Sequence, residues 1–456
     1  MKTIITLAYL LSSILFIFGI KNLSSPKTAR RGNMLAMVAM LIAIVVTLFD
    51  QKILDFTFII IGVVIGSAIG AVIATRTQMT AMPQMVALLN GFGGGASAFV
   101  SLAEYYRISG EPQLDVITSL VLGLFIGALT LAGSLVAYSK LQGLVKTAPV
   151  VFRLQQSLNL LLVFICLILG VVFSFHPTSG TSLLAIFAIA LVLGVLFVIP
   201  IGGADMPVVI SLLNSYSGLA AAATGFVISN YILIVSGALV GASGIILTLI
   251  MCKAMNRSLR NVIFGAVGGV ISENIAKYER RKVTEYTPED AVMILESARS
   301  VIIIPGYGLA VARAQYILHD LEKALINKNV NVRYAIHPVA GRMPGHMNVL
   351  LAEANVSYNL LYDLDNINDD FQNTDVVLVV GANDVINPAA RTDKNCPLYG
   401  MPILNADKAK IVIVCKRSLS PGFSGIDNEL FYSQKTMMIF GDAKDSIIEI
   451  VKLLNA

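Results

Sequence analysis

The sequence predicts two parts of different fold class: an α-helical membrane domain with about nine transmembrane helices, followed by an α/β domain built on a doubly wound parallel sheet. Residues 1–255 are almost continuously apolar, whereas residues 289–456 alternate short strand-like runs with helical patterns. The charge also changes sign, because residues 1–288 carry 18 Lys and Arg against 9 Asp and Glu, and residues 289–456 carry 15 against 19. We therefore expect a membrane domain at 1–255, a hinge or linker at 256–288 and a soluble domain at 289–456.

The composition excludes several classes of protein. Hydrophobic residues make up 56% of the chain and charged residues 13%, with a mean hydropathy of +0.77, which is typical of an integral membrane protein. The acidic balance of the soluble part argues against nucleic acid as a partner. The four cysteines show neither metal-ligand spacing nor a C-x-x-C pair, so no metal site is expected.

Nine apolar stretches are long enough to cross about 30 Å of hydrocarbon. They lie at roughly 3–20, 34–49, 56–75, 83–103, 114–138, 157–175, 182–200, 206–228 and 231–252. Most basic residues before 260, Lys140 among them, fall in alternate loops, whereas the opposite loops hold only Lys52 and Arg107 beside several acids. Because basic loops stay on the cytoplasmic side, the N-terminus is expected outside and the C-terminal domain in the cytoplasm.

Four polar residues in or at the edge of the spans are candidates for a proton path. They are Asn90, Ser134, Asp205 and Asn214. A polar side chain in hydrocarbon is costly and usually faces a partner or a hydrated cavity, so both an interhelical hydrogen bond and a water-filled path remain open for each. After the last span, Lys253 and Arg257 mark the membrane face, and the glycine-rich segment 265–269 suggests a hinge that transmits motion.

The soluble part begins with a strand-like run at Ser300–Pro305, a Gly306-Tyr307-Gly308 turn and a helical pattern from Leu309 to about Ile326. Further strand-like runs at 330–336, 375–380, 410–415 and 437–440 alternate with helical patterns, which indicates a parallel, Rossmann-like sheet. The dinucleotide fingerprint is incomplete because Val311 replaces its third glycine, so a tight turn without a ligand is also open.

Two features favour NADP over NAD as the ligand. No acidic residue ends the second strand, where an NAD site places a partner for the ribose 2′-hydroxyl. Lys416-Arg417-Ser418 follows the fourth strand-like run and offers two cations and a hydroxyl to a 2′-phosphate. The alternative is a solvated charge pair at the end of a strand.

Four segments resemble the signature segments of the beta subunit of proton-translocating nicotinamide nucleotide transhydrogenase, and the resemblance covers nearly the whole chain. The segments are Gly202–Val209 with Leu213–Gly218, Met251–Ser258, His337–Asn348, and Gly381–Asp384 with Asn387–Ala390. The resemblance implies Re/Si-specific hydride transfer between NADH and NADP, coupled to proton movement into the cell. It also implies that this chain binds NADP(H) and supplies most of the membrane domain, within the cell (inner) membrane.

A partner alpha subunit, of one chain or two, is expected to bind NAD(H) and supply the remaining helices. The beta chain alone is then inactive, and the complete alpha-beta unit is expected to form a dimer in the lipid bilayer.

The resemblance implies NADP contacts on the turns that follow the strands. They comprise Gly306, Tyr307, Gly308, Val339, Ala340, Gly341, Arg342, Met343, Pro344, Gly381, Ala382, Asn383, Asp384, Val385, Gly400, Met401, Lys416, Arg417, Ser418, Gly422, Phe423, Asp442 and Ala443. Arg342 would lie near the phosphates, and Asp384, near the nicotinamide, is the candidate catalytic residue. Residues 420–428 would form a lid, in which relatives often have tyrosine at the position of Phe423. The nucleotide would bind in a reversed orientation that presents nicotinamide to the partner.

The main departure from the family is Asn90, which occupies a position that many relatives fill with a proton-carrying histidine. Asparagine does not titrate, so the hypothesis is that the relay base comes from helices of the partner chain. Asn90, Ser134 and Asn214 would order water beside it, while Asp205, Lys253 and Arg257 couple the path to the nucleotide domain.

Two other classes of function are alternatives for a chain of this kind. A nucleotide-regulated ion channel or transporter would explain the two-part chain, but no carbonyl-filter sequence is visible. A transmembrane electron-transfer oxidoreductase would need haem, which the lack of histidine within the spans disfavours.

Overall fold

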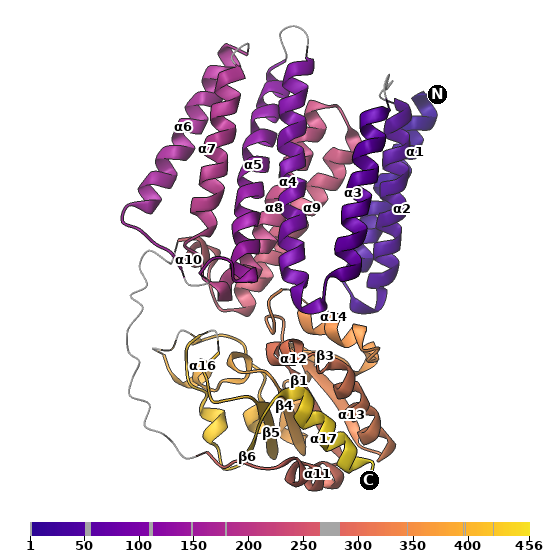
Figure 1. The fold of residues 1–456 in the computed structure, drawn as a ribbon, viewed down its shortest axis with the longest axis vertical. Coiled ribbons are helices and arrows are strands. Elements are labelled where there is room, and N and C mark those ends of the chain that lie inside the picture. The colour runs from indigo at the N-terminus through magenta and orange to yellow at the C-terminus, as the bar shows by residue number, and fades with distance from the viewer. Residues whose placement is uncertain are drawn as a thin grey trace. The chain divides into compact units, whose positions relative to one another are not determined.

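The computed structural model describes residues 2–50, 56–108, 113–146, 149–177, 180–264, 283–343, 345–394, 396, 398–422 and 424–456 (Figure 1). The chain divides into two compact units, residues Met1–Thr248 and Leu249–Ala456. The first is helical and the second contains the only sheet among the described residues. Most of the expected hinge, residues 265–282, lies outside the described residues.

The described residues contain nine helices that are long and apolar enough to span a membrane, as the sequence predicts. They are α1 (Lys2–Leu23), α2 (Pro26–Asp50), α3 (Thr57–Arg76), α4 (Met82–Arg107), α5 (Leu114–Gln142), α6 (Gln155–Phe175), α7 (Gly180–Val198), α8 (Met206–Val227) and α9 (Tyr231–Ala254). Several extend beyond their apolar stretch: α2 begins eight residues before the expected 34, and α5 ends four residues after 138. The loop position predicted for Lys140 is therefore wrong, because this lysine lies in the last turn of α5.

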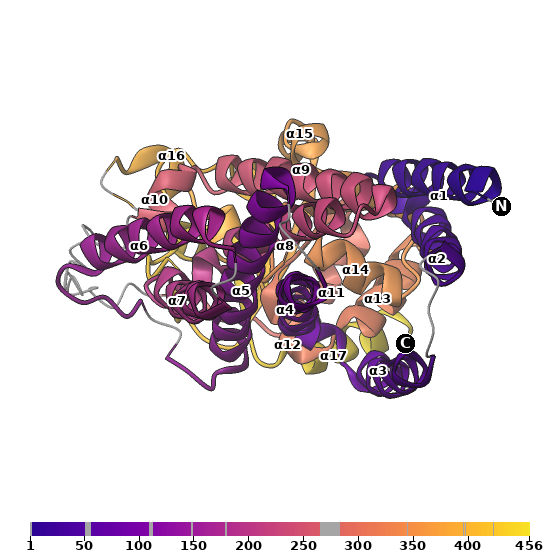
Figure 2. The same ribbon diagram turned by 90° about the horizontal axis from the view of Figure 1, so that it is seen from above.

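Helices α4, α5 and α8 pack against one another, with α7 beside α5 and α6 beside α7 (Figure 2). The contact between α4 and α5 needs glycine, because a Cβ on Gly127 would lie 2.5 Å from the carbonyl oxygen of Gly94. Small residues let membrane helices approach this closely, which is how they gain packing energy without a hydrophobic driving force. Helix α3 differs, since none of its residues is buried.

The second unit is a six-stranded parallel sheet with the order β3-β2-β1-β4-β5-β6. The strands are β1 (Ser300–Pro305), β2 (Asn331–Ile336), β3 (Leu361–Asp363), β4 (Val376–Val380), β5 (Ile411–Lys416) and β6 (Thr436–Phe440). This order reverses between β1 and β4, as in the doubly wound dinucleotide-binding fold. The predicted fold class is therefore confirmed, and five of the strands were predicted within one residue at each end.

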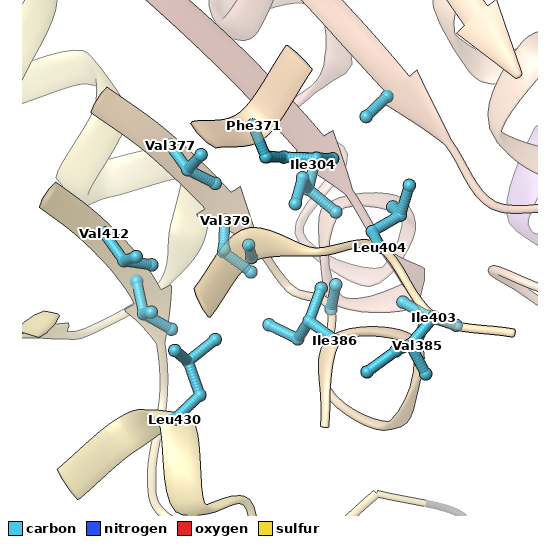
Figure 3. Packing of buried hydrophobic residues seen from close by; sticks show 14 of the residues in the cluster. Ile304, Phe371, Val377, Val379, Val385, Ile386, Ile403, Leu404, Val412 and Leu430 are labelled. Atoms are coloured by element: carbon cyan, nitrogen blue, oxygen red, sulfur yellow. The ribbon is translucent and has the colours of Figure 1, made fainter. Parts of the chain in front are cut away.

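Both faces of the sheet are buried, so its central strands are almost entirely apolar, as parallel strands require. On one face α11 (Pro288–Ser297), α13 (Gln315–Asn327) and α17 (Ala443–Leu454) pack together. On the other face the alternate strand residues Ile304, Val377, Val379 and Val412 pack against short helical turns and loops rather than long helices (Figure 3). Those segments contribute Phe371, Ile386, Leu404 and Leu430.

Two local features differ from the sequence prediction. The helical pattern from Leu309 is interrupted, giving α12 (Tyr307–Ala312) and α13, because Arg313 adopts a left-handed conformation with φ of 51°. No glycine or proline in the sequence marks this break. Strand β3 was missed because it is only three residues long and too short to show a pattern.

Candidate nucleotide site and membrane polar residues

The site expected for a dinucleotide lies where the strand order reverses, at the carboxyl ends of β1 and β4. Each of these strands is followed by a glycine turn, Gly306-Tyr307-Gly308 after β1 and Gly381-Ala382-Asn383-Asp384 after β4. The two turns are hydrogen bonded, since Gly306 N donates to Val380 O at 2.9 Å and Gly308 N donates to Gly381 O at 3.0 Å. Residues 73 and 74 positions apart in the chain thus lie together at the carboxyl ends of β1 and β4.

The glycines are required because the two turns cross with backbone against backbone. A Cβ on Gly306 would lie 2.4 Å from the Ala382 backbone, and one on Gly308 would lie 2.6 Å from Gly381 Cα. Gly381 also has a φ of 71°, which favours glycine. Val311 at the third fingerprint position is 43% exposed, so no close approach calls for glycine there. The incomplete fingerprint is therefore compatible with a dinucleotide turn.

Tyr307, Arg342 and His346 form one cluster beside this edge. The Arg342 guanidinium lies 4.3 Å from the centre of the Tyr307 ring, and the rings of Tyr307 and His346 are 6.2 Å apart. The backbone N–H of Arg342 donates to His346 Nδ1 at 3.0 Å, which fixes the Gly341–Met343 turn onto α14 (His346–Glu353). The proximity of a cation to a glycine turn suits a pyrophosphate group.

The sequence prediction did not single out the roles of His337 and His346, because nothing local reveals what they contact. His337 Nε2 lies 2.7 Å from Pro402 O, and its Nδ1 accepts from Val339 N at 3.2 Å. Burial lowers the pKa of His337 to about 4, and burial together with the nearby Arg342 cation lowers the pKa of His346 to about 4. Both rings are therefore neutral at physiological pH and hold the 337–346 segment in place as hydrogen-bonding groups.

The predicted lid, residues 420–428, contacts the turn after β4. The Asp384 carboxylate accepts from Ser424 N at 3.0 Å and from Ser424 Oγ at 2.8 Å. Asn428 Nδ2 donates to Asn383 O at 3.1 Å, and Asn387 Nδ2 donates to Asp427 O at 3.0 Å. Asp384 is thus engaged by the lid, so its acceptor bonds change if the lid moves.

Lys416, Arg417 and Ser418 lie at the end of β5, with Arg417 and Ser418 exposed and Lys416 half-buried. Lys416 Nζ donates to Ser420 O and lies 4.8 Å from the centre of the Phe431 ring. Burial lowers the pKa of Lys416, and the carboxylates of Asp384 and Asp427 oppose that shift. The three residues present cationic and hydroxyl donors at the same edge as the glycine turns, which suits a phosphate monoester.

The remaining predicted contacts lie on the loops around this edge. Gly400 has a φ of 79°, and Met401 and Ala340 are buried. Asp442 caps α17, since its side chain accepts from Lys444 N at 3.0 Å, and Ala443 begins that helix. Val339 and Val385 pack against or within the core of the sheet. Pro344 and Phe423 lie outside the described residues.

In the membrane unit the structure brings together two of the four predicted polar residues. Asn90 Nδ2 on α4 donates to Ser134 Oγ on α5 at 3.0 Å, and both residues are buried. Asn90 Oδ1 has no hydrogen-bond partner among the described atoms. Asn214 lies on α8, which packs against both helices, and the buried Asp205 ends the 3-10 turn Gly203–Asp205 that leads into α8.

The charged residues expected to couple the two domains lie at the end of α9. Lys253 is in the last turn of this helix, and Arg257 follows it, with its backbone N–H donating to Cys252 O at 2.9 Å. Both side chains are exposed. No described group of three or more His, Cys, Asp or Glu side chains is suited to a metal ion.

Known proteins are similar to this chain over nearly its whole length. A family model described as NAD(P) transhydrogenase beta subunit matches residues 5–453. Two curated relatives from Rhodospirillum rubrum, both named NAD(P) transhydrogenase subunit beta, are 49% identical over 458 residues, which covers 98% of this chain and 98% of each relative. The predicted membership is confirmed: this chain belongs to the NAD(P) transhydrogenase beta subunit family.

Proposed function

We propose that this chain is the NADP(H)-binding and membrane subunit of a transhydrogenase that transfers hydride between NADH and NADP and couples this transfer to inward proton movement. The observation that carries the proposal is the position of the Gly306 and Gly381 turns at the reversal of strand order, with Lys416, Arg417 and Ser418 at the end of the neighbouring strand β5. A metal or a catalytic triad is not required, because hydride transfer is the chemistry of the nicotinamides themselves.

The preference for NADP rests on two strand ends. β2 ends at Ile336 and continues into His337 and Pro338, so β2 itself does not end in a carboxylate that could bind a ribose 2′-hydroxyl. At the end of β5, Arg417 and Ser418 are exposed beside Lys416 and are suited to a 2′-phosphate. In this proposal Arg342 holds the pyrophosphate and Asp384 lies near the nicotinamide.

The protein's task is to position the nucleotide, exclude water and link its binding to protonation. A charge that crosses 100 mV gains about 2.3 kcal/mol, so a driving force of roughly 200 mV supplies about 4.6 kcal/mol. By linkage, this energy biases the exchange only if protonation alters the relative affinities for NADP and NADPH. The contacts of Asp384 with Ser424 in the predicted lid are one element in which a change of arrangement would alter nucleotide affinity.

The assembly proposed here includes an alpha subunit that binds NAD(H) and contributes further helices. The chain lies in the cell (inner) membrane with its N-terminus outside and the nucleotide unit in the cytoplasm, as its basic residues favour. Asn90 and Ser134 would order water next to a relay base supplied by the partner, since neither side chain titrates in the physiological range.

The first test is the reaction itself. Membrane vesicles that contain this chain and its alpha subunit should reduce an NAD analogue with NADPH, and a protonophore should alter the rate. Vesicles that lack either subunit should be inactive. Transport of ions that depends on NADP binding, without any hydride transfer in the complete complex, would instead support a nucleotide-regulated channel.

The second test addresses nucleotide preference. Arg417→Gln should weaken NADPH binding about tenfold or more, because a charge-assisted hydrogen bond is lost, and should leave NADH binding unchanged. Isothermal titration of the solubilised complex measures both affinities. Lys328→Gln is the matched control, because it removes the same charge at the amino end of β2 and should leave both affinities unchanged. An equal loss of NADPH and NADH affinity in the Arg417 variant would contradict the assignment.

The third test concerns the membrane path. Asp205→Asn removes a buried carboxylate at the start of α8 and should reduce proton-linked turnover about tenfold or more, while NADPH binding persists. Rates in vesicles with and without an imposed pH gradient measure the effect. Unchanged proton-linked turnover would remove Asp205 from the path.

A further inference from the structure

Lys140 is the most deeply buried cation among the described residues, and nothing in the proposed function yet uses it. Its side chain is 1% exposed in the last turn of α5. Nζ donates to Ile199 O at 2.6 Å and to Ile201 O at 2.8 Å. Among the described residues it forms no ion pair with an acid. A buried lysine held only by backbone carbonyls has a different task from a basic residue that marks a cytoplasmic loop.

The carbonyl groups that Lys140 binds belong to the connection between α7 and α8. Helix α7 ends at Val198, so both carbonyl groups lie one to three residues beyond its carboxyl end, where the helix dipole favours a cation. Ile199 O also accepts from Val150 N at 3.2 Å, so three segments of the chain meet at this one oxygen atom.

The same connection leads directly to Asp205. Ile201 is 1% exposed, and only Gly202, Gly203 and Ala204 separate it from the aspartate. Asp205 N donates to Gly202 O at 3.1 Å in the 3-10 turn that begins α8. Gly202 and Gly203 do not fix the backbone conformation by themselves. The hydrogen bonds of Lys140 to Ile199 O and Ile201 O therefore set the position at which this turn begins.

A second contact ties the same end of α5 to α4. Gln84 Nε2 on α4 donates to the carbonyl oxygen of Leu141, the residue after Lys140, at 3.3 Å. Six residues before Lys140 on α5, Ser134 accepts from Asn90, which is six residues after Gln84 on α4. The Asn90–Ser134 hydrogen bond and the Lys140 anchor therefore lie about 9 Å apart along the axis of α5, at 1.5 Å per residue.

We propose that Lys140 is a positioning residue for proton-linked turnover: it fixes the α7–α8 connection through Ile199 and Ile201 and thereby holds Asp205 in register with the Asn90–Ser134 pair. This inference rests on the proposed function, because it assumes that Asp205 takes part in proton coupling. Lys140 acts through the backbone and through Asp205, and is not itself a carrier of the proton.

The test uses the complete complex in vesicles. Lys140→Met removes both donors and should lower proton-linked turnover about tenfold or more, as expected when a reacting group is displaced by about 1 Å. The affinity for NADPH should stay within about twofold of the unaltered complex, since the change lies outside the nucleotide site. Lys146→Met removes the same charge from an exposed position after α5 and should have no effect on either quantity.

Rescue separates positioning from proton carrying. Lys140→Arg restores two donors but does not deprotonate in proteins, so it should recover at least about a third of the turnover if Lys140 only positions. Fully assembled Met and Arg variants that are equally inactive would overturn the proposal in favour of a proton carrier. Normal turnover in the Met variant would overturn it outright. If the Met variant does not assemble, Lys140→Gln takes its place with a different expectation. Glutamine keeps a neutral donor but has no titratable group, so positioning predicts partial turnover, and an assembled but inactive Gln variant beside an inactive Arg variant would overturn the proposal.

A double variant tests whether Lys140 acts through Asp205. Residues that act as one unit are not additive, so Lys140→Met combined with Asp205→Asn should be no slower than Asp205→Asn alone. If the double variant instead loses proton-linked turnover by the product of the two single losses, Lys140 does not act through Asp205, and the proposal is overturned. If Asp205→Asn alone leaves proton-linked turnover intact while hydride transfer proceeds, the assumed role of Asp205 fails, whereas absent hydride transfer in the unaltered complex is a failure of the proposed function itself.

Discussion

The two units of this protein place their polar residues in different ways. In the nucleotide unit the candidate residues lie on turns that follow strands, as with Gly306 after β1, Gly381 after β4 and Lys416 at the end of β5. In the membrane unit most of them lie inside long helices, as with Asn90 in α4 and Ser134 in α5. A turn can be recognised from its residue composition, whereas the sequence of a helix does not show which residue of a neighbouring helix a given side chain contacts.

The difference has a physical origin. A parallel sheet collects the ends of all its strands at one edge, so residues far apart in sequence meet there by topology alone. A helix bundle has no such edge, and a polar side chain finds its partner only through the rotation and depth of each helix. Asn90 contacts Ser134 because α4 and α5 approach closely, with Gly94, four residues after Asn90, packed against Gly127.

The largest expected effect concerns the crossing of the two turns in the nucleotide unit. Gly306→Ala places a Cβ 2.4 Å from the Ala382 backbone, so the turns must separate. We expect NADPH affinity to fall about 100-fold, from a strain of roughly 3 kcal/mol. Titration of the solubilised complex with NADPH measures it. Val311→Ala, on the exposed side of α12, is the matched control and should leave affinity unchanged. Wild-type affinity in the Gly306 variant would mean that the turns do not form the site.

The next effect concerns the two buried neutral histidines, which have no counterpart in the membrane unit. The pKa of His337 is about 4 in the folded protein, against 6.5 for an ordinary histidine. The unfolded chain therefore binds more protons between these values, so stability is fully present above about pH 6.5 and is lost as the pH falls toward 4. The limiting contribution is about 3 kcal/mol for a shift of this size.

Hydrogen exchange of the β1 and β4 amides in the intact complex, corrected for intrinsic exchange, measures the slope of stability against pH. His337→Gln should reduce it, because glutamine keeps a donor for Pro402 O but does not titrate. His176→Gln changes the histidine that follows α6 in the membrane unit and should leave the slope unchanged. A slope that is identical in the His337 variant would exclude this histidine as its source.

Much of the fold follows from the sequence, but the partners of buried polar groups do not. The strand at Ser300–Pro305 was predicted with its observed bounds because an apolar run ends in a glycine turn. The break at Arg313, which separates α12 from α13, could not be predicted because arginine rarely adopts the left-handed conformation that it has here.

The candidate site shows the same limit. Gly306, Gly381 and Lys416 were predicted together and do lie at one edge of the sheet, because each ends a recognisable strand. The contacts of Lys140 with carbonyl oxygens 59 and 61 residues away could not be predicted, and its charge alone suggested a loop. A long apolar stem lets lysine occupy either environment, so residue type does not decide between them.

The smallest expected effect compares two glycines within the membrane unit. Gly127→Ala brings a Cβ to 2.5 Å from Gly94 O, so α4 and α5 must separate, and we expect a loss of about 1 to 3 kcal/mol in stability. Gly62 on α3 has nothing within 4 Å of the position of a Cβ, and no residue of α3 is buried, so Gly62→Ala should change stability by less than about 0.5 kcal/mol in the beta chain alone.

Thermal midpoints of the purified beta chain and of the complete complex measure both variants. Equal effects of the two substitutions in the beta chain alone would contradict the packing of α4 on α5. A loss at Gly62 that occurs only in the complex would have a different meaning, because it would show that a helix of the partner lies against α3. The comparison therefore separates glycines that close contacts within this chain from glycines whose contact must come from outside it.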